Sequence, residues 1–203
     1  MGATMSGMWR SVAIMAALFL LSGCGNIVRS EVALFSAADE GDGLSFRPGV
    51  WIDNDSECKF DERLPVVEWP ACADPVIFGP KGLKDPKLEG AIERVAVGDP
   101  LILQIGDKSG GYSCAGMEII ARDGRGRATA LRVWPAMCGP PPVPASDGST
   151  SGRKITQSPL PGLEIRGEDC IATEKAAVRR SAKASKAWAE APMEIHWAQD
   201  AKR

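Results

Sequence analysis

The stretch MEIIARDGRGRATALRVW, residues 117–134, decides the fold. It consists of two β-prone segments, Met117–Arg122 and Thr129–Trp134, on either side of the glycine-containing turn 123–127. Two apolar runs around such a turn are typical of a β-hairpin. The stretch therefore predicts two antiparallel strands, in which the numbers of facing residues sum to about 250.

A second hairpin is predicted where Ile92–Val97 and Leu101–Ile105 flank Gly98, Asp99 and Pro100. Other β-prone segments are separated by Asp, Asn, Gly and Pro, which are typical of turns. They are Val50–Ile52, Cys58–Phe60, Val66–Trp69, Val76–Phe78 and, near the C-terminus, Met193–Trp197. Because these segments recur at short spacing, we expect a mainly antiparallel sheet, built as a meander, a sandwich or a small open barrel.

One helix is predicted over 173–190, with Thr173 at its start and Pro192 beyond its end. At about 100° per residue, one helix face carries four cations and the opposite face carries mostly small residues. The four cations are Lys175, Arg179, Lys183 and Lys186. We interpret this basic face as a contact surface for anionic lipid, peptidoglycan or an acidic protein, or alternatively as a solvated face. Together the sheet and the helix predict an α+β fold.

The N-terminus has the order of a secretory signal. A single cation, Arg10, precedes an apolar run over residues 12–21, and small residues follow. The run is shorter than the roughly 20 apolar residues that cross a membrane. Leu21-Ser22-Gly23-Cys24 resembles the lipobox of bacterial lipoproteins. The resemblance implies attachment of diacylglycerol to the Cys24 thiol through a thioether, removal of residues 1–23, and acylation of the new amino terminus by a fatty acid such as palmitate.

This resemblance implies a domain organisation and a location. Residues 1–23 are the expected signal peptide, 24–47 a lipidated N-terminus and tether, and 48–203 a disulfide-stapled β-rich domain. An aspartate after the lipidated cysteine favours retention at the inner membrane, whereas this chain has Gly25. We therefore expect the periplasmic face of the outer membrane, with the inner membrane as the alternative.

The mature part also resembles, through Leu34–Asp39 and the cysteine-bearing blocks after it, a group of bacterial lipoproteins of no known function. The expected partners are the membrane, through the lipid anchor, and envelope proteins or peptidoglycan. Removing 23 of the 203 residues leaves 180 and changes the formal charge from −2 to −3, because the signal carries Arg10 and no acid. A charge this near zero does not indicate a nucleic acid partner.

Five cysteines remain once the lipidated one is set aside, and in an oxidising compartment they are expected to form disulfides. Cys58 and Cys72 enclose a short loop. Cys114 and Cys138 sum to 252, close to the value expected for facing residues of the hairpin. We predict these two disulfides and an unpaired Cys170. The alternative pairs Cys138 with Cys170.

Residues 139–162 contain six prolines among Gly, Ser, Asp and Thr, which predicts a linker or a functional loop. His196 is the only histidine, so a zinc site of several imidazoles is excluded. Asp53–Glu57 carries alternating acids but lacks the glycine and the distant glutamate of an EF-hand, so we interpret it as a solvated turn. No metal or cofactor is expected.

The sequence contains neither Gly-x-Ser-x-Gly nor His-Glu-x-x-His, and it assigns no catalytic residue. The leading hypothesis is a non-enzymatic, lipid-anchored periplasmic domain with a binding or assembly role at the cell envelope. The alternative hypothesis is an envelope enzyme, a carboxylate-dependent hydrolase acting on glycan.

Overall fold

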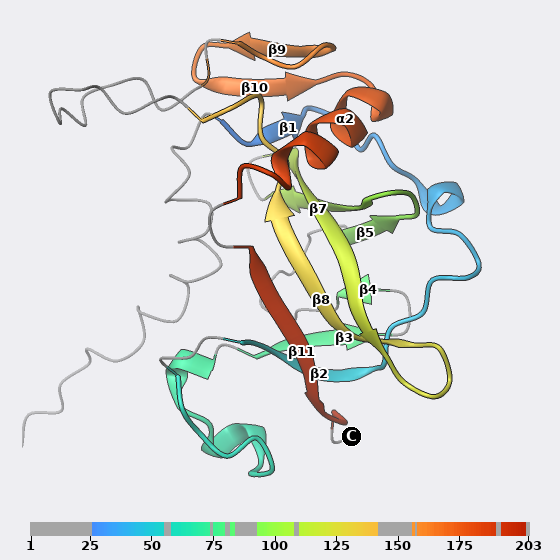
Figure 1. The fold of residues 1–203 in the computed structure, drawn as a ribbon, viewed down its shortest axis with the longest axis vertical. Coiled ribbons are helices and arrows are strands. Elements are labelled where there is room, and N and C mark those ends of the chain that lie inside the picture. The colour runs from blue at the N-terminus through green and yellow to red at the C-terminus, as the bar shows by residue number, and fades with distance from the viewer. Residues whose placement is uncertain are drawn as a thin grey trace, which may run out of the picture.

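The computed structural model describes residues 26–54, 58–73, 75–79, 82–83, 93–107, 110–141, 156, 158–189 and 192–201. Its strands form one mixed, mostly antiparallel open sheet, and one α-helix lies near the C-terminus (Figure 1). The α+β fold is therefore confirmed. Among the described residues, no helix is both long enough and apolar enough to cross a membrane.

The strands are β1 (Val28–Ser30), β2 (Gly49–Asp53), β3 (Val76–Gly79), β4 (Gly82–Leu83), β5 (Glu93–Ala96), β6 (Leu101–Asp107), β7 (Gly111–Arg122), β8 (Ala128–Pro135), β9 (Leu163–Arg166), β10 (Asp169–Ala172) and β11 (Met193–Gln199). The helices are α2 (Lys175–Ser185) and the short 3-10 helices η1 (Ala37–Asp39), η2 (Val66–Glu68) and η3 (Ala71–Ala73). The strand order is β4-β3-β2-β11-β8-β7-β1-β10-β9, and β6 joins β5 to β7.

The hairpin of β7 and β8 is the longest pairing in the described sheet, and its register confirms the prediction from residues 117–134. Gly116 faces Trp134 and Ile119 faces Leu131, both with an index sum of 250. The hairpin of β5 and β6 is confirmed as well, with Val95 facing Leu103. The closing strand β11 pairs with both β8 and β2. It therefore joins β2 and β8, which are far apart in the sequence, in one sheet.

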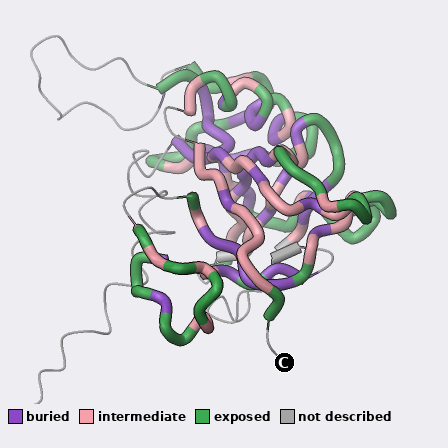
Figure 2. Tube along the Cα trace, turned by 60° about the horizontal axis from the view of Figure 1, so that its bottom comes forward, coloured by how far each residue is buried: buried purple, intermediate pink, exposed green. Residues whose placement is uncertain are grey.

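Three apolar clusters hold these elements together, and they follow the buried parts of the chain in Figure 2. The upper core contains Val28, Phe35, Ala96, Ile102, Cys114, Ala136, Cys138, Leu163, Cys170, Ala172, Ala177, Val178 and Ala182. The lower core contains Phe46, Trp51, Val76, Phe78, Val95, Met117, Ala128, Leu131 and Ile195. The loop core contains Val50, Ile52, Trp69 and Ala73. The sheet curves around the lower core until β4 contacts β5.

Helix α2 packs on the sheet through small side chains and backbone bonds. Trp134 donates its indole N–H to the carbonyl of Ala182 at 2.7 Å. The facing residue is Gly116, where a Cβ atom would lie 2.5 Å from the indole ring. Glycine thus gives the indole the space it needs beneath the helix.

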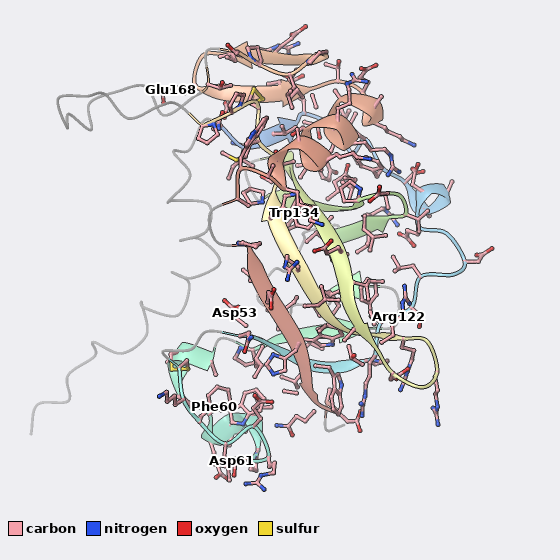
Figure 3. All side chains as sticks on the ribbon, viewed as in Figure 1. Asp53, Phe60, Asp61, Arg122, Trp134 and Glu168 are labelled. Carbon is pink, nitrogen blue, oxygen red and sulfur yellow. A yellow bond between two sulfur atoms is a disulfide. The ribbon has the colours of Figure 1, made fainter. Side chains whose placement is uncertain are left out.

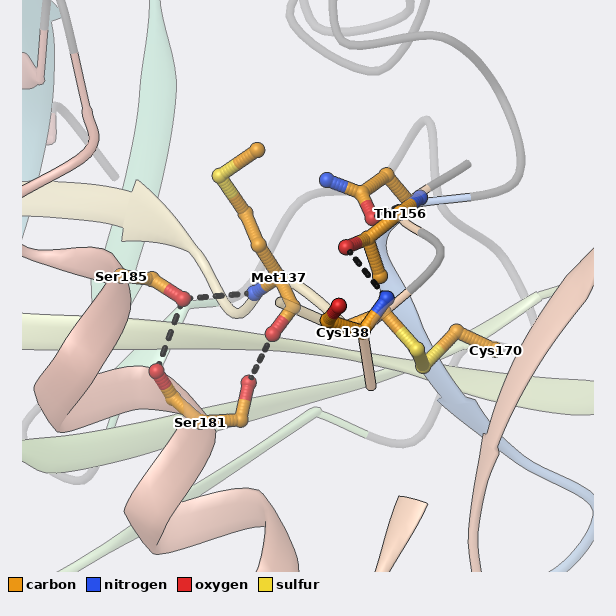
Figure 4. The surroundings of a disulfide bond; sticks show 8 residues. Met137, Cys138, Thr156, Cys170, Ser181 and Ser185 are labelled. Atoms are coloured by element: carbon orange, nitrogen blue, oxygen red, sulfur yellow. Dashed lines mark hydrogen bonds between the residues drawn. A yellow bond between two sulfur atoms is a disulfide. The ribbon is translucent and has the colours of Figure 1, made fainter. Parts of the chain in front are cut away.

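Two buried serines attach the same C-terminal half of α2 to the segment that follows β8 (Figure 4). The hydroxyl of Ser181 donates to the carbonyl of Met137, and the N–H of Met137 donates to the hydroxyl of Ser185, both at 2.7 Å. The helix begins at Lys175, after Glu174 at its N-cap, and ends at Ser185. It is therefore shorter at both ends than the predicted 173–190, and hydrogen-bonded turns continue the chain from Ser185 to Ala189.

The prediction of a tether over 24–47 is wrong for its described part, residues 26–47. Strand β1 lies between β7 and β10, and Asn26 is buried and accepts the N–H of Cys138 at 2.6 Å. Gln104 accepts the N–H groups of Leu34 and Phe35 at 2.9 and 3.0 Å, and Phe35 is buried. Sequence periodicity missed this because the strand has only three residues.

The structure pairs Cys58 with Cys72, as predicted, and Cys138 with Cys170, which was the alternative. The predicted bond between Cys114 and Cys138 is wrong. In the hairpin register, the carbonyl of Cys114 accepts the N–H of Ala136, so Cys138 lies two residues beyond it. Cys114 is free and buried, and burial raises the pKa of its thiol to about 12.

Near the disulfides, the secondary structure differs from the predicted strands and loops. The segment Cys58–Phe60 is not a strand, and Val66–Trp69 contains the 3-10 helix η2 instead of a strand, because the disulfide loop folds back on itself. An unexpected hairpin of β9 and β10 follows the proline-rich region, with a turn at Gly167 in the left-handed conformation. The end of that region is packed, since Leu160 donates its N–H to the carbonyl of Cys138.

Candidate functional site

The turn between β7 and β8, residues 123–127, is held rigid by one carboxylate. Asp123 accepts the backbone N–H groups of Arg125 and Arg127 at 2.9 and 3.0 Å. Its second oxygen accepts the guanidinium of Arg127 at 2.8 Å. The Arg127 side chain is the main reason that the pKa of Asp123 is lowered. Aspartate side chains commonly accept hydrogen bonds from backbone N–H groups of the turn in which they lie.

Arg122 and Gly126 complete this turn. Arg122 donates to the carbonyl of Gly126 at 2.6 Å, and Gly126 has a positive φ of 76°, which favours glycine. Figure 3 shows Arg122 at the turn end of the hairpin and Trp134 at the opposite end, beneath α2. The turn is therefore well separated from the helix.

A segment from far earlier in the chain runs beside the turn. Arg47 donates its N–H to Ala128 and Ala128 donates to Ser45, so the segment pairs with the first residue of β8. The Arg47 guanidinium lies over the indole of Trp197, 3.1 Å from the ring centroid. The Trp197 N–H in turn donates to the carbonyl of Pro48. This stacking fixes the position of the Arg47 side chain.

Together these elements form an open hollow of about 500 Å³. It is lined by Arg47, Asp123, Gly124, Arg125, Arg127 and Asp200. Three guanidinium groups thus face two carboxylates, one of which, Asp123, is already paired with Arg127. Arg47 and Arg125 have no carboxylate partner among the described residues. The hollow presents N–H donors in excess and is suited to an anionic group.

The hollow is less suited to acid catalysis by Asp123. A glycosidase acid needs a raised pKa so that it carries a proton at neutral pH. The pKa of Asp123 is instead lowered, chiefly by Arg127. Asp123 therefore acts as a structural acceptor and gives no support to the glycan-hydrolase alternative.

The structure places the four cations of the predicted basic helix face against partners in the protein. Lys175 binds Asp39 at 2.7 Å, Lys183 approaches Asp99 at 3.4 Å, and Lys186 binds Glu118. The fourth, Arg179, lies over the ring of Phe35 at 5.3 Å. These contacts attach the helix to η1 and to the sheet. They leave less of the basic face for a partner than the sequence indicated, and its contact role stays a prediction.

The remaining candidate residues do not form a site. His196 lies 3.2 Å from Glu62, on the disulfide loop, and its strand is packed between β2 and β8. No group of three or more His, Cys, Asp or Glu side chains suited to a metal ion occurs in the part of the chain that the structure describes. Asp55–Glu57 of the acidic turn and Cys24 lie outside the described residues.

The sequence predicts the turn 123–127 but does not indicate the hollow beside it. The available signal was the grouping of three arginines, Arg122, Arg125 and Arg127, within six residues. Arg47 and Asp200 are distant in sequence and reach the turn only through the sheet. Comparison with protein-family models, curated proteins and solved structures finds no match.

Proposed function

We propose that the protein is exported, lipidated on Cys24 and held directly against the membrane as a binding domain of the cell envelope. The observation that carries the close attachment is the short separation in sequence between Cys24 and the fold. Only Gly25 separates that cysteine from Asn26, which is 2 % exposed and bonded to Cys138. A lipid anchor on Cys24 would therefore hold the folded sheet itself close to the membrane.

The two disulfides support export. Both Cys138 and Cys170 are buried in the upper core, and Cys58 and Cys72 close a loop on the surface. Disulfides persist in oxidising compartments such as the bacterial periplasm and are rare in the cytosol. This chemistry agrees with the signal-like N-terminus.

The anchor and the hollow lie at opposite ends of β8. Ile27 bridges Met137 just beyond one end of β8, and Phe46 bridges Ala128 at the other. Nine residue steps at about 3.3 Å each separate these positions by roughly 30 Å. With the anchored end against the membrane, the hollow consequently lies at the far end of β8, where a ligand of the envelope can reach it.

Lipidation is tested by growing cells with an alkyne analogue of palmitate. We expect the label on the wild-type protein in the membrane fraction, and an unlabelled, soluble Cys24→Ala variant. The matched control is Cys114→Ala, which keeps the label because Cys114 is a buried free thiol. Label retained by Cys24→Ala would contradict the anchor.

Close attachment is tested by photo-crosslinking to lipid from two exposed positions. A crosslinker replacing Pro140, near the anchored end, is expected to capture phospholipid, whereas one replacing Gly124 in the hollow is not. A flexible spacer inserted between Gly25 and Asn26 should abolish the difference. Equal capture from both positions in the protein without a spacer would contradict the proposed orientation.

A further inference from the structure

We propose that the hollow at the β7–β8 turn binds the phosphate group of a small ligand that also carries hydroxyl or ammonium groups. This inference goes beyond the lipid-anchored role and does not depend on Cys24. It rests on the charges that line the hollow, on the way they are held, and on the size of the space.

The charges come from three separate parts of the chain. Arg125 and Arg127 belong to the turn, Arg47 to the segment before β2, and Asp200 follows β11. Three cations against two carboxylates leave one net positive charge, before any ligand is bound. Guanidinium groups present paired N–H donors that match phosphate oxygens.

Two of the guanidinium groups are fixed before a ligand arrives. Arg47 lies on the Trp197 indole, and Arg127 is bonded by both its Nε and a terminal nitrogen to Asp123. Fixed donors lose less conformational entropy on binding than free side chains do. Arg125 is exposed and has no described side-chain partner, so it is free to close over the anion.

The size and polarity of the hollow define the ligand further. About 500 Å³ is within the range of small-molecule sites. The lining consists of charged side chains and one glycine, so a polar ligand is favoured over an apolar one. Asp200 is an acceptor on the same hollow, and it would bond a hydroxyl or ammonium group next to the phosphate.

The test is calorimetric titration of the mature protein with glucose 1-phosphate, inorganic phosphate and glucose at low ionic strength. We expect glucose 1-phosphate to bind more tightly than inorganic phosphate, and glucose not to bind. The variants Arg47→Gln and Arg125→Gln should each weaken binding by about tenfold, since each removes charge-assisted bonds. High salt should weaken binding of the wild-type protein.

The matched control is Arg166→Gln, which removes the same charge from an exposed ion pair with Glu164 on β9. It should bind as the wild-type protein does, and unchanged circular dichroism should show that all variants fold. The proposal is overturned if Arg47→Gln and Arg125→Gln bind as tightly as this control, or if the wild-type protein shows no saturable binding.

A second arm of the test distinguishes a soluble phosphate ester from a lipid headgroup. Vesicles containing phosphatidylglycerol are mixed with the Cys24→Ala protein and with its Arg125→Gln derivative. Binding to vesicles that Arg125→Gln abolishes would assign the phosphate to a headgroup. Absence of vesicle binding, together with retained binding of glucose 1-phosphate, would assign it to a soluble ester.

Discussion

The upper core and the disulfide loop 58–73 use the same three kinds of bond in different surroundings. Each has a disulfide, a glutamine that bonds its irregular segment from a neighbouring strand, and a tryptophan whose N–H donates to a carbonyl. The glutamines are Gln104 on β6 and Gln199 on β11, and the tryptophans are Trp134 beside the upper core and Trp69 in the loop. In and beside the upper core these groups are buried. In the loop the disulfide and Gln199 are partly exposed, and Trp69, itself buried, donates to the carbonyl of the exposed Leu64. The comparison shows how burial changes the contribution of one bond type.

The difference follows from what replaces a lost bond. In the loop, water can reach the freed carbonyl or N–H, so little free energy is lost. In the upper core, an unpaired polar group stays dry and its full desolvation cost remains. We therefore expect the upper core to be the more sensitive region, and it is also the region to which the proposed anchor is attached.

The largest effect is expected from the disulfides. Replacing Cys138 and Cys170 with alanine opens a loop whose ends are 32 residues apart in sequence. For Cys58 and Cys72 the separation is 14. The chain-entropy model gives about 3.7 and about 3 kcal/mol, and lost packing adds about 1 kcal/mol in the buried case. Urea unfolding of both double variants measures this, and a larger loss for the loop would contradict the comparison.

Replacing the two glutamines should give a larger difference in the free energy of unfolding between the two regions. Gln104→Met leaves the N–H groups of Leu34 and Phe35 unpaired in the interior, which we expect to cost about 3 kcal/mol. Gln199→Met removes bonds to the carbonyls of Glu62 and Leu64 near solvent, at less than about 1 kcal/mol. Urea unfolding measures both losses, and faster amide exchange at Phe35 in Gln104→Met should accompany the first. Protected exchange there would show that the conformation of the segment around Phe35 does not depend on Gln104.

Replacing the two tryptophans should give a smaller difference in the free energy of unfolding. Trp134→Phe removes a bond to the carbonyl of Ala182 in the upper core, and we expect a loss of about 2 kcal/mol. Trp69→Phe removes the corresponding bond to Leu64 in the loop, with an expected loss of about 1 kcal/mol. Thermal unfolding followed by circular dichroism compares the two, and equal shifts in Tm would argue against burial as the cause.

The smallest effect concerns pH and the ion pair that attaches α2 to η1. The bond from Lys175, with help from Ser36, lowers the pKa of Asp39 from 3.8 to about 2. A depressed pKa stabilises the folded state fully above pH 3.8, and this contribution is lost as the pH falls towards 2. Because Lys175 is 45 % exposed, we expect less than about 1 kcal/mol.

The measurement for this pair is urea unfolding of Lys175→Met between neutral pH and pH 2. Its stability should be below that of the wild-type protein at neutral pH and should converge with it at the acid end. The control is Lys183→Met, whose partner Asp99 is 93 % exposed, and no pH-dependent difference is expected there. A constant difference across the range would assign the effect of Lys175 to packing.

Much of the fold was predictable from local patterns. The β-prone segments around residues 123–127 and around Gly98 predicted two hairpins, and for the first of them the predicted register was correct too. The short loop between Cys58 and Cys72 gave the correct disulfide. These features depend on residues close together in the chain, where turn geometry and side-chain alternation restrict the choice.

The failures all involve distant partners or very short elements. The sequence predicted Cys114 instead of Cys170 as the partner of Cys138. The index sum of 252 for that pair differs by two from the hairpin register, and an error of this size is expected when the register is estimated from one turn. Strand β1 has three residues, too few for a periodic signal, yet it lies between β7 and β10. The candidate site shows the same limit, since Arg47 meets the turn only because Phe46 pairs with Ala128.

The sequence by itself determined the α+β class, the strands of the two main hairpins, the helix near the C-terminus and the loop disulfide. The tertiary structure alone decided that Cys138 pairs with Cys170, that residues 26–47 belong to the sheet, and that three arginines share one hollow. The physical reason is that local patterning specifies which side of an element is apolar. Which other element covers that side depends on packing of the whole chain.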